Sequence, residues 1–284
     1  MENRATGDMV TDYIKDQPLI SFASSEQPFF LRCLIKIFEH FFGWRKVESI
    51  YHQIKPNPFS IENFIKNAFQ VARIDHRFNK RTLQKIPNSG PLVFIANHPF
   101  GVIDGIALCD LAVRTRGDFR ILIHAVMCQD EDLARYFLPV DFSKTKEATR
   151  NNIRSKRIAK KALIEGIPLI VFPSGFVSTA NKFGLGRVEE APWTTFAAKM
   201  IRDSKATVVP VYFEGQNSRI FHVASHLSDA LRSLALLNEV KKRFHRPVNT
   251  IIGEPLFWEE LECVGDRKTL TRFLYNEVQK LKPR

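Results

Sequence analysis

The stretch Ile95-Ala96-Asn97-His98-Pro99-Phe100-Gly101-Val102-Ile103-Asp104-Gly105 decides the fold. An apolar run at 91–96 leads into it and predicts a buried strand, and the run at 106–113 that follows has the length and composition of a helix. Pro and two Gly between regular elements require a tight, specific loop. Because loops on a rigid scaffold often carry catalytic groups, we expect function to concentrate at this strand-to-helix junction.

Two side chains of this loop, His98 and Asp104, can move or stabilise a proton. Neutral imidazole is a good base at about pH 7, and a carboxylate behind it fixes its tautomer and stabilises the imidazolium. The loop contains no Ser or Cys nucleophile, so the simplest chemistry is deprotonation of a substrate hydroxyl by His98, with Asp104 behind it. The same pair is also compatible with a core histidine and a helix N-cap aspartate.

Composition indicates a globular chain with a basic surface. The 284 residues are 44% hydrophobic and 25% charged, which is enough for one sizeable core and a small extra element. A net charge of +12 predicts affinity for anionic surfaces, such as acidic lipid headgroups, acidic carrier proteins or nucleic acid. No aromatic interleaving or binding module accompanies the basic residues, so we expect no nucleic-acid partner.

Four cysteines, at 33, 109, 128 and 263, are scattered without a CxxC pair. This spacing is typical of reduced thiols in a cytosolic protein, and we expect neither a disulfide framework nor a metal site. Residues 1–25 are polar, and no run of about 18 uninterrupted apolar residues occurs, so we expect no signal peptide and no membrane-spanning helix.

An apolar, Phe-rich helix is predicted at 29–42, stopped by Gly43 and followed by Trp44, Arg45 and Lys46. Two interpretations of it stay open from this stretch alone. It could lie in a membrane interface, since it is too short to span and is edged by Trp and bases. It could equally pack on the domain core, which is the common fate of an apolar stripe.

Along the rest of the chain, predicted strands alternate with predicted helices. The strands fall at 91–96, 119–125, 167–172, 207–213 and 248–252, with a further short strand within 73–86. The helices fall at 60–72, capped by Ser60, and at 106–113, 131–137, 146–165, 193–203, 227–244 and 266–281, with a loop at 182–192. The pattern predicts an α/β fold with a mostly parallel central sheet flanked by helices, preceded by an N-terminal amphipathic helical element.

The His98 loop resembles the first motif of the glycerolipid (lysophospholipid) acyltransferase superfamily, in which an Asp follows the His after four residues; here five residues intervene. Its longer form, Asn-His-Pro-Phe-Gly-x-x-Asp-Gly, resembles the bacterial hemolysin-like branch, which includes ornithine-lipid acyltransferases. Two later blocks continue the resemblance, in order, from about residue 80 to 260. They are Phe-Pro-Ser-Gly at 172–175, where many members have Glu instead of Ser, and Val-Pro-Val-Tyr-Phe-x-Gly-Gln-Asn-Ser at 209–218.

The resemblance implies an O-acyltransferase that moves a fatty acyl group from acyl carrier protein or coenzyme A to the hydroxyl of a lyso-lipid, of the lyso-ornithine or lysophosphatidic type. No tightly bound cofactor is implied, since the acyl thioester is a co-substrate. His98 would be the general base and Asp104 its orienting partner. Substrate binding is predicted for backbone donors near Gly175, for a basic residue of the 146–165 helix, and for these residues: Arg150, Arg154, Ser174, Gly175 and Asn217.

This substrate class favours the membrane interpretation of the N-terminal helix. We therefore divide the chain into a helical, membrane-associating segment at 1–79 and an acyltransferase α/β domain at 80–284. The protein is expected to bind peripherally to the anionic cytoplasmic face of the inner (plasma) membrane. The predicted membrane contacts are Phe30, Leu34, Phe38, Phe41 and Trp44.

Two other functions are weighed against this one. A non-catalytic lipid-binding or membrane-disturbing, hemolysin-like protein would keep the basic charge and the apolar N-terminus, but it would not need a His/Asp pair in a loop. A hydrolase would need an activated nucleophile. A lipase-type elbow has Gly two residues before and after its Ser, whereas Phe172 and Phe176 flank Ser174 here.

Overall fold

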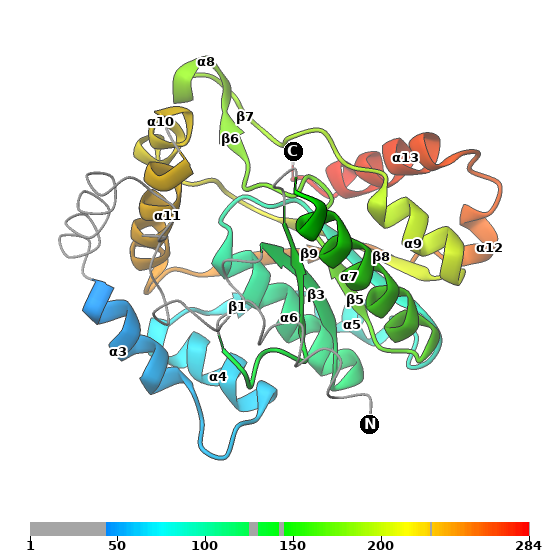
Figure 1. Ribbon diagram of the computed structural model, residues 1–284, viewed down its shortest axis with the longest axis horizontal. Coiled ribbons are helices and arrows are strands. Elements are labelled where there is room, and N and C mark those ends of the chain that lie inside the picture. Colours follow the sequence, from blue (N-terminus) through cyan, green and yellow to red (C-terminus); the bar gives the residue numbers. More distant parts are fainter. Residues whose placement is uncertain (1–43, 125–129, 142–144, 228, 284) are drawn as a thin grey trace.

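A seven-stranded sheet forms the centre of the computed structural model, which describes residues 44–124, 130–141, 145–227 and 229–283 (Figure 1). The strand order is β1-β9-β8-β2-β5-β3-β4. Neighbouring strands run parallel except for β8 and β9, which are antiparallel. The strands are β1 (His76–Arg77), β2 (Leu92–Ala96), β3 (Arg120–His124), β4 (Phe137–Val140), β5 (Leu169–Val171), β8 (Thr207–Phe213) and β9 (Val248–Ile252).

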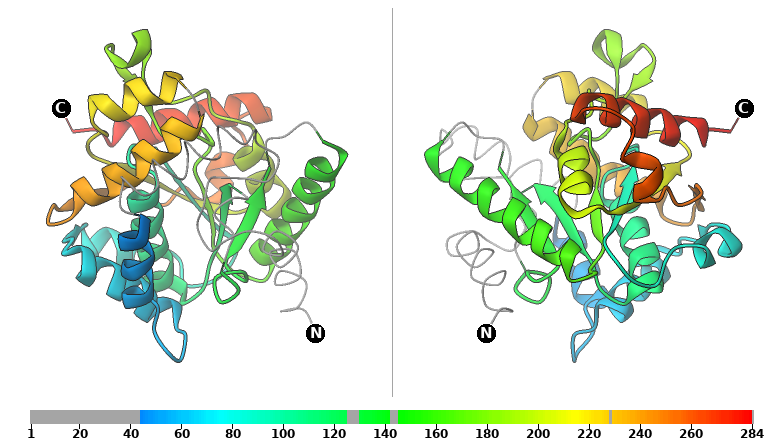
Figure 2. Two further views of the ribbon diagram at one scale, coloured as in Figure 1. Left: turned by 60° about the vertical axis from the view of Figure 1, so that its left-hand side comes forward. Right: turned by 90° about the vertical axis from the view of Figure 1, so that its right-hand side faces the viewer.

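The central strand β2 is apolar along its whole length because both faces of the sheet are covered. All five of its residues are completely buried, as expected of a central parallel strand. Leu92, Phe94 and Ala96 pack on one face, against α4 (Ile61–Ala72) and α6 (Val102–Arg116). Val93 and Ile95 pack on the other, against α7 (Lys146–Ile164), α9 (Phe196–Ser204) and α13 (Arg267–Lys280). Figure 2 shows these helices on the two faces.

The remaining helices lie at the ends and edges of the sheet. They are α3 (Trp44–Ile54), α5 (Lys80–Gln84), α10 (Arg219–Leu227), α11 (Asp229–Arg243) and α12 (Trp258–Leu261). α3 is attached to the body through Lys55, whose ammonium lies 2.8 Å from the carboxylate of Asp130, and through a hydrogen bond from Tyr51 to the same carboxylate. A two-stranded hairpin is formed by β6 (Thr179–Ala180), α8 (Asn181–Gly184) and β7 (Val188–Glu189).

The α/β fold with a mostly parallel sheet is confirmed, as is the Ser60 cap, which accepts from the Asn63 amide. Three local predictions were wrong. The segment predicted as a short helix at 131–137 is a turn leading into β4, in which the Asp130 carboxylate accepts the amides of Asp132 and Leu133. The predicted loop at 182–192 contains most of the hairpin, and α10 is an additional helix before α11.

Four of the five predicted membrane contacts, Phe30, Leu34, Phe38 and Phe41, lie outside the described residues, and the fifth, Trp44, is the first residue of α3. Among the described residues, no helix combines the length and apolar character needed to cross a bilayer. Residues before position 80 also contribute to the sheet, since β1 pairs with β9.

The side chain of Asn97, the residue after β2, continues the hydrogen bonding between β2 and β8. Its Nδ2 donates to the Phe213 carbonyl at 2.9 Å, and its Oδ1 accepts the Phe213 amide at 2.7 Å. The side chain is almost fully buried. It therefore satisfies two backbone groups at the carboxyl end of β8 and fixes the start of the His98 loop.

We expect Asn97→Ala to lower the free energy of unfolding by about 2–4 kcal/mol, because it leaves two buried backbone groups of Phe213 without partners. Urea titration measures this change. The matched control is Asn88→Ala, an exposed asparagine whose loss should change stability by less than about 0.5 kcal/mol. Equal effects of the two substitutions would contradict this role of Asn97.

Candidate active site

The backbone of His98 is held from two directions by segments far away in sequence. Its carbonyl accepts the amide of Ser178 at 2.8 Å, and its amide donates to Oε1 of Glu190 at 3.1 Å. Ser178 and Glu190 are the residues directly before and after the β6–β7 hairpin. The hairpin base and the His98 loop therefore form one structural unit at the carboxyl end of β2.

The imidazole of His98 is oriented by an aromatic ring and a carboxylate. It stacks on Phe172 with ring centroids 3.9 Å apart and an interplanar angle of 23°. Its Nδ1 lies 3.1 Å from Oδ1 of Asp104, although the two atoms are not aligned for a hydrogen bond. In unliganded enzymes such bonds are often misaligned and tighten in the substrate complex. With Nδ1 facing Asp104, Nε2 is the nitrogen left for a substrate.

Asp104 is completely buried in the first turn of α6. Its Oδ2 accepts the Phe100 amide at 2.8 Å and its Oδ1 accepts the Gly105 amide at 3.0 Å. Both carboxyl oxygens therefore accept a backbone amide at the start of α6. The N-cap is Gly101, not Asp104, and its positive φ of 83° turns the chain within the five-residue interval. The extra residue therefore does not prevent contact between His98 and Asp104.

A second buried His/Asp pair shows what a purely structural arrangement looks like in this chain. Nδ1 of His76 lies 2.8 Å from Asp110, and its Nε2 lies 3.0 Å from the hydroxyl of Thr250. Both ring nitrogens of His76 are thus used within the fold, to join β1, α6 and β9. His98 differs because, within the part of the chain that the structure describes, only its Nδ1 faces a protein group, and its side chain is 16% exposed.

The turn after β5 places Ser174 and Gly175 close to the His98 loop. The Ser174 hydroxyl and the Gly175 amide both donate to carbonyls of neighbouring residues. Ser174 is buried and its hydroxyl donates to the Phe176 carbonyl at 3.0 Å. The Gly175 amide donates to the Phe172 carbonyl at 2.9 Å. The Gly175 amide therefore closes a turn in this conformation, and the role predicted for backbone donors near Gly175 in holding an oxyanion stays a prediction.

Asn217 lies in the loop after β8, which packs on the His98 loop. A Cβ on Gly215, whose φ is +117°, would come within 2.7 Å of the Phe100 ring. Asn217 is 3% exposed, and within the described residues neither its side-chain oxygen nor its nitrogen has a partner. A buried amide without partners is costly unless a ligand satisfies it, which agrees with the prediction that Asn217 binds substrate.

Arg243 of α11 was not singled out from the sequence. Its guanidinium lies 4.0 Å from the centre of the ring of Phe100, a residue of the His98 loop. The same positive charge interacts electrostatically with Asp104. Arg150 and Arg154, which were singled out, lie on α7, where Arg150 is exposed and Arg154 half-buried. The N-terminal end of α7 follows β4 and so lies at the carboxyl ends of the strands, on the same side of the sheet as His98.

Glu190 is the second residue of this site that the sequence did not indicate. It accepts the His98 amide, and its Oε2 accepts the indole N–H of Trp193 at 3.2 Å. Burial raises the pKa of Glu190 to about 7. The two hydrogen bonds lower this pKa and the nearby charge of Asp104 raises it, but burial has the largest effect. The segment around it was predicted as a loop, and the partner lies 92 residues away, so no local signal marks it.

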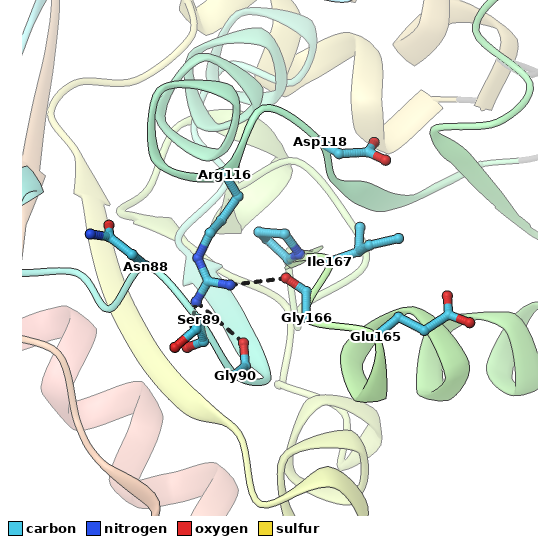
Figure 3. A pocket seen from close by; sticks show the side chains of 9 residues that line it. Asn88, Ser89, Gly90, Arg116, Asp118, Glu165, Gly166 and Ile167 are labelled. Atoms are coloured by element: carbon cyan, nitrogen blue, oxygen red, sulfur yellow. Dashed lines mark hydrogen bonds between the residues drawn. The ribbon is translucent and has the colours of Figure 1, made fainter.

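A separate depression of about 370 Å³ lies at the amino ends of β2 and β5, opposite the strand ends that carry His98. Figure 3 shows Arg116 reaching into it. The guanidinium donates to backbone carbonyls of the turns before these two strands, at Pro87, Ser89, Gly90 and Gly166. Arg116 therefore fixes two strand entries, and this depression has none of the features of the His98 site.

The His/Asp pair lies at the carboxyl end of the central strand, where α/β sheets bind ligands, and its two side chains are chemically suited to proton transfer. The chain matches the family model described as Acyltransferase over residues 42–283, and it belongs to that family. It is therefore a transferase of acyl groups.

Two curated relatives are similar over most of their length. A lyso-glycine lipid O-acyltransferase from Phocaeicola vulgatus is 27% identical over 216 residues, covering 73% of this chain and 74% of that protein. A lyso-glycine lipid O-acyltransferase from Bacteroides thetaiotaomicron is 25% identical over 231 residues, covering 76% and 81%. The crystal structure of the 1-acyl-sn-glycerophosphate acyltransferase PlsC from Thermotoga maritima aligns over 99% of this chain and 98% of that chain, with a TM-score of 0.48 and 16% identity.

We predict that Glu190 makes stability depend on pH in a defined window. The unfolded carboxyl loses its proton near the ordinary pKa of 4.5, whereas the folded one keeps it until about 7. Between these values the unfolded state binds fewer protons, so stability falls as pH rises. Relative to Glu190→Gln, the wild type should lose about 3 kcal/mol of unfolding free energy across this window. Urea titrations at several pH values measure this, and parallel pH profiles of the two proteins would contradict it.

Proposed function

We propose that this protein is an O-acyltransferase that moves a fatty acyl group from an acyl thioester to the hydroxyl of a lyso-lipid. The observation that carries the proposal is the His98–Asp104 pair, in which a fully buried carboxylate lies 3.1 Å from Nδ1 and leaves Nε2 for a substrate. Membership of the acyltransferase family supplies the reaction class.

The proposed reaction needs one base and no covalent enzyme intermediate. The lyso-lipid hydroxyl gives its proton to Nε2 of His98 while its oxygen attacks the thioester carbonyl carbon. Asp104 stabilises the imidazolium that forms. When the tetrahedral intermediate collapses, the C–S bond breaks and the leaving thiolate takes the proton back from His98. The products are the O-acylated lipid and the free thiol of the carrier.

Substrate binding is assigned in part to Asn217. Its buried Nδ2 and Oδ1 have no partners within the described residues, and its loop packs on Phe100 of the catalytic loop. We assign to this amide a polar group of the acceptor or the developing oxyanion. Arg150 or Arg154 would hold an acidic headgroup or a donor phosphate, as the resemblance implies.

The acceptor that we propose carries an amino-acid headgroup. The names of the two curated relatives support a lyso-glycine lipid, and the sequence resemblance supports a lyso-ornithine lipid, with lysophosphatidic acid as the phosphate-bearing alternative. The donor would be acyl carrier protein or coenzyme A thioester. Since the acceptor is a lipid of the bilayer, we propose that the protein works peripherally on the cytoplasmic membrane face.

We expect His98→Ala to lower the rate of acyl transfer by about 10²–10⁴-fold, because the reaction loses its general base, and Asp104→Asn to impair it in the same sense. Purified protein is incubated with acyl-ACP or acyl-CoA and a panel of lyso-lipids, and products are measured by mass spectrometry. Circular dichroism checks that each variant is folded.

Ser174→Ala serves as the matched control, because its hydroxyl is used by a backbone carbonyl, and it should keep most of the activity. Near wild-type turnover in His98→Ala would contradict the mechanism. An inactive but folded Ser174→Ala would instead favour a hydrolase-type nucleophile.

A further inference from the structure

The β6–β7 hairpin projects from the body of the protein beside α10 (Figures 1 and 2). Its tip carries two large apolar side chains in solvent, Phe183 with 78% exposure and Leu185 with 67%. Lys182 and Phe183 both have left-handed backbone conformations, with φ of 49° and 55°. This conformation is uncommon for a bulky residue and often marks a functional position.

The tip is fixed to α10 and does not hang free. A Cβ on Gly184 would come within 2.5 Å of the Val223 amide nitrogen, so glycine permits the close approach of the two backbones. The Ala180 amide donates to Nδ1 of His222 at 3.3 Å, and Nε2 of His226 donates to the Ala180 carbonyl at 2.7 Å. The hairpin and α10 are therefore one rigid surface.

The exposed apolar side chains of α10, which line a shallow groove shared with α11, enlarge the apolar area of this surface. Its exposed residues recur at helical spacing: Ile220 with 67% exposure, Val223 with 37% and Leu227 with 68%. We call Phe183, Leu185 and these three residues the apolar tip surface. Contiguous apolar groups in solvent mark an interaction site more often than a solvated surface.

Basic side chains surround the apolar tip surface. Lys182 and Arg187 are exposed on the hairpin, and Arg219 is exposed at the start of α10. Glu189, the carboxylate on the hairpin strand β7, accepts a hydrogen bond from the Asn181 amide at 3.0 Å. An apolar centre with a basic rim is complementary to a bilayer interface with anionic headgroups, where side chains insert and bases remain at the headgroup level.

The same hairpin sets the position of the catalytic histidine. Ser178 and Glu190, at its two ends, hold the carbonyl and the amide of His98. Whatever surface the tip enters is therefore kept at a fixed distance from Nε2 of His98.

We propose that the apolar tip surface inserts into an anionic lipid bilayer and holds the active site at the headgroup layer. The choice of a lipid surface over a protein surface rests on the proposed function, in which the acceptor is a membrane lipid. The tip would act together with any contact made by residues outside the described range.

The first test compares the full-length double variant Phe183→Ser, Leu185→Ser with wild type and with Ile164→Ser. Ile164 is 64% exposed at the C-terminal end of α7, which precedes β5. It therefore lies near the amino ends of the strands, away from the hairpin. Binding is measured by flotation with phosphatidylcholine vesicles containing phosphatidylglycerol. The double variant should bind at least about tenfold more weakly, and Ile164→Ser should bind like wild type.

Activity on two forms of the acceptor separates docking from catalysis. On vesicle-borne lyso-lipid, kcat/KM of the double variant should fall at least about tenfold, in parallel with binding, whereas on a short-chain lyso-lipid that is monomeric in water it should stay within about twofold. Unchanged vesicle binding overturns the proposal, as do equal losses on both substrates. Unchanged vesicle binding with a raised KM for acyl carrier protein would assign the surface to that carrier.

A second measurement does not depend on turnover. The emission of a Phe183→Trp variant should be quenched by vesicles of brominated phosphatidylglycerol more strongly than that of an Ile164→Trp variant. Equal quenching of the two overturns the proposal. Because flotation and quenching need no catalysis, a chain without acyltransferase activity could still bind through this surface, so failure of the proposed function and failure of this inference give different results.

Discussion

The buried carboxylate of Asp104 is the constraint on which the site depends. A fully buried charge without partners would cost several kcal/mol, so the surrounding chain is arranged to satisfy it. The amides of Phe100 and Gly105 donate to its two oxygens, and the first turn of α6 adds its positive end. This requires Gly101 to take a positive φ, where a Cβ would come within 2.9 Å of Leu236. The same turn buries the Phe100 ring between Gly215 and Arg243.

Three strands that are neighbours in the sheet bring the rest of the site to this carboxylate. β2 lies between β8 and β5, and all three run parallel, so their carboxyl ends share one edge. The loop after β5 supplies Phe172, which stacks on His98, and the loop after β8 supplies Asn217. The hairpin beyond β5 holds the backbone of His98 at both ends. Contacts with segments distant in sequence therefore hold the backbone and ring of the histidine, while Asp104, from its own loop, faces Nδ1.

Local patterns in the sequence predicted the parts of the structure that depend on local chemistry. The uninterrupted apolar run of β2, the Ser60 cap and the alternation of strands and helices predicted the sheet and its flanking helices. The loop residues His98 and Asp104 were placed together correctly. The role of Glu190 could not be predicted, because its contact with His98 joins residues 92 positions apart. The sequence also could not show that the Gly175 amide donates to the Phe172 carbonyl, because that hydrogen bond depends on the conformation of the folded backbone.

The central claim is that His98 activates the acceptor hydroxyl for direct transfer, without an acyl-enzyme. Intact-protein mass spectrometry after incubation with an acyl thioester, first without and then with lyso-lipid, tests it most directly. The account predicts an unchanged protein mass with donor alone and the appearance of O-acylated lipid once the acceptor is added. A stoichiometric acyl adduct on Ser174, or on any other side chain, that is transferred to the lipid on addition of the acceptor would contradict it.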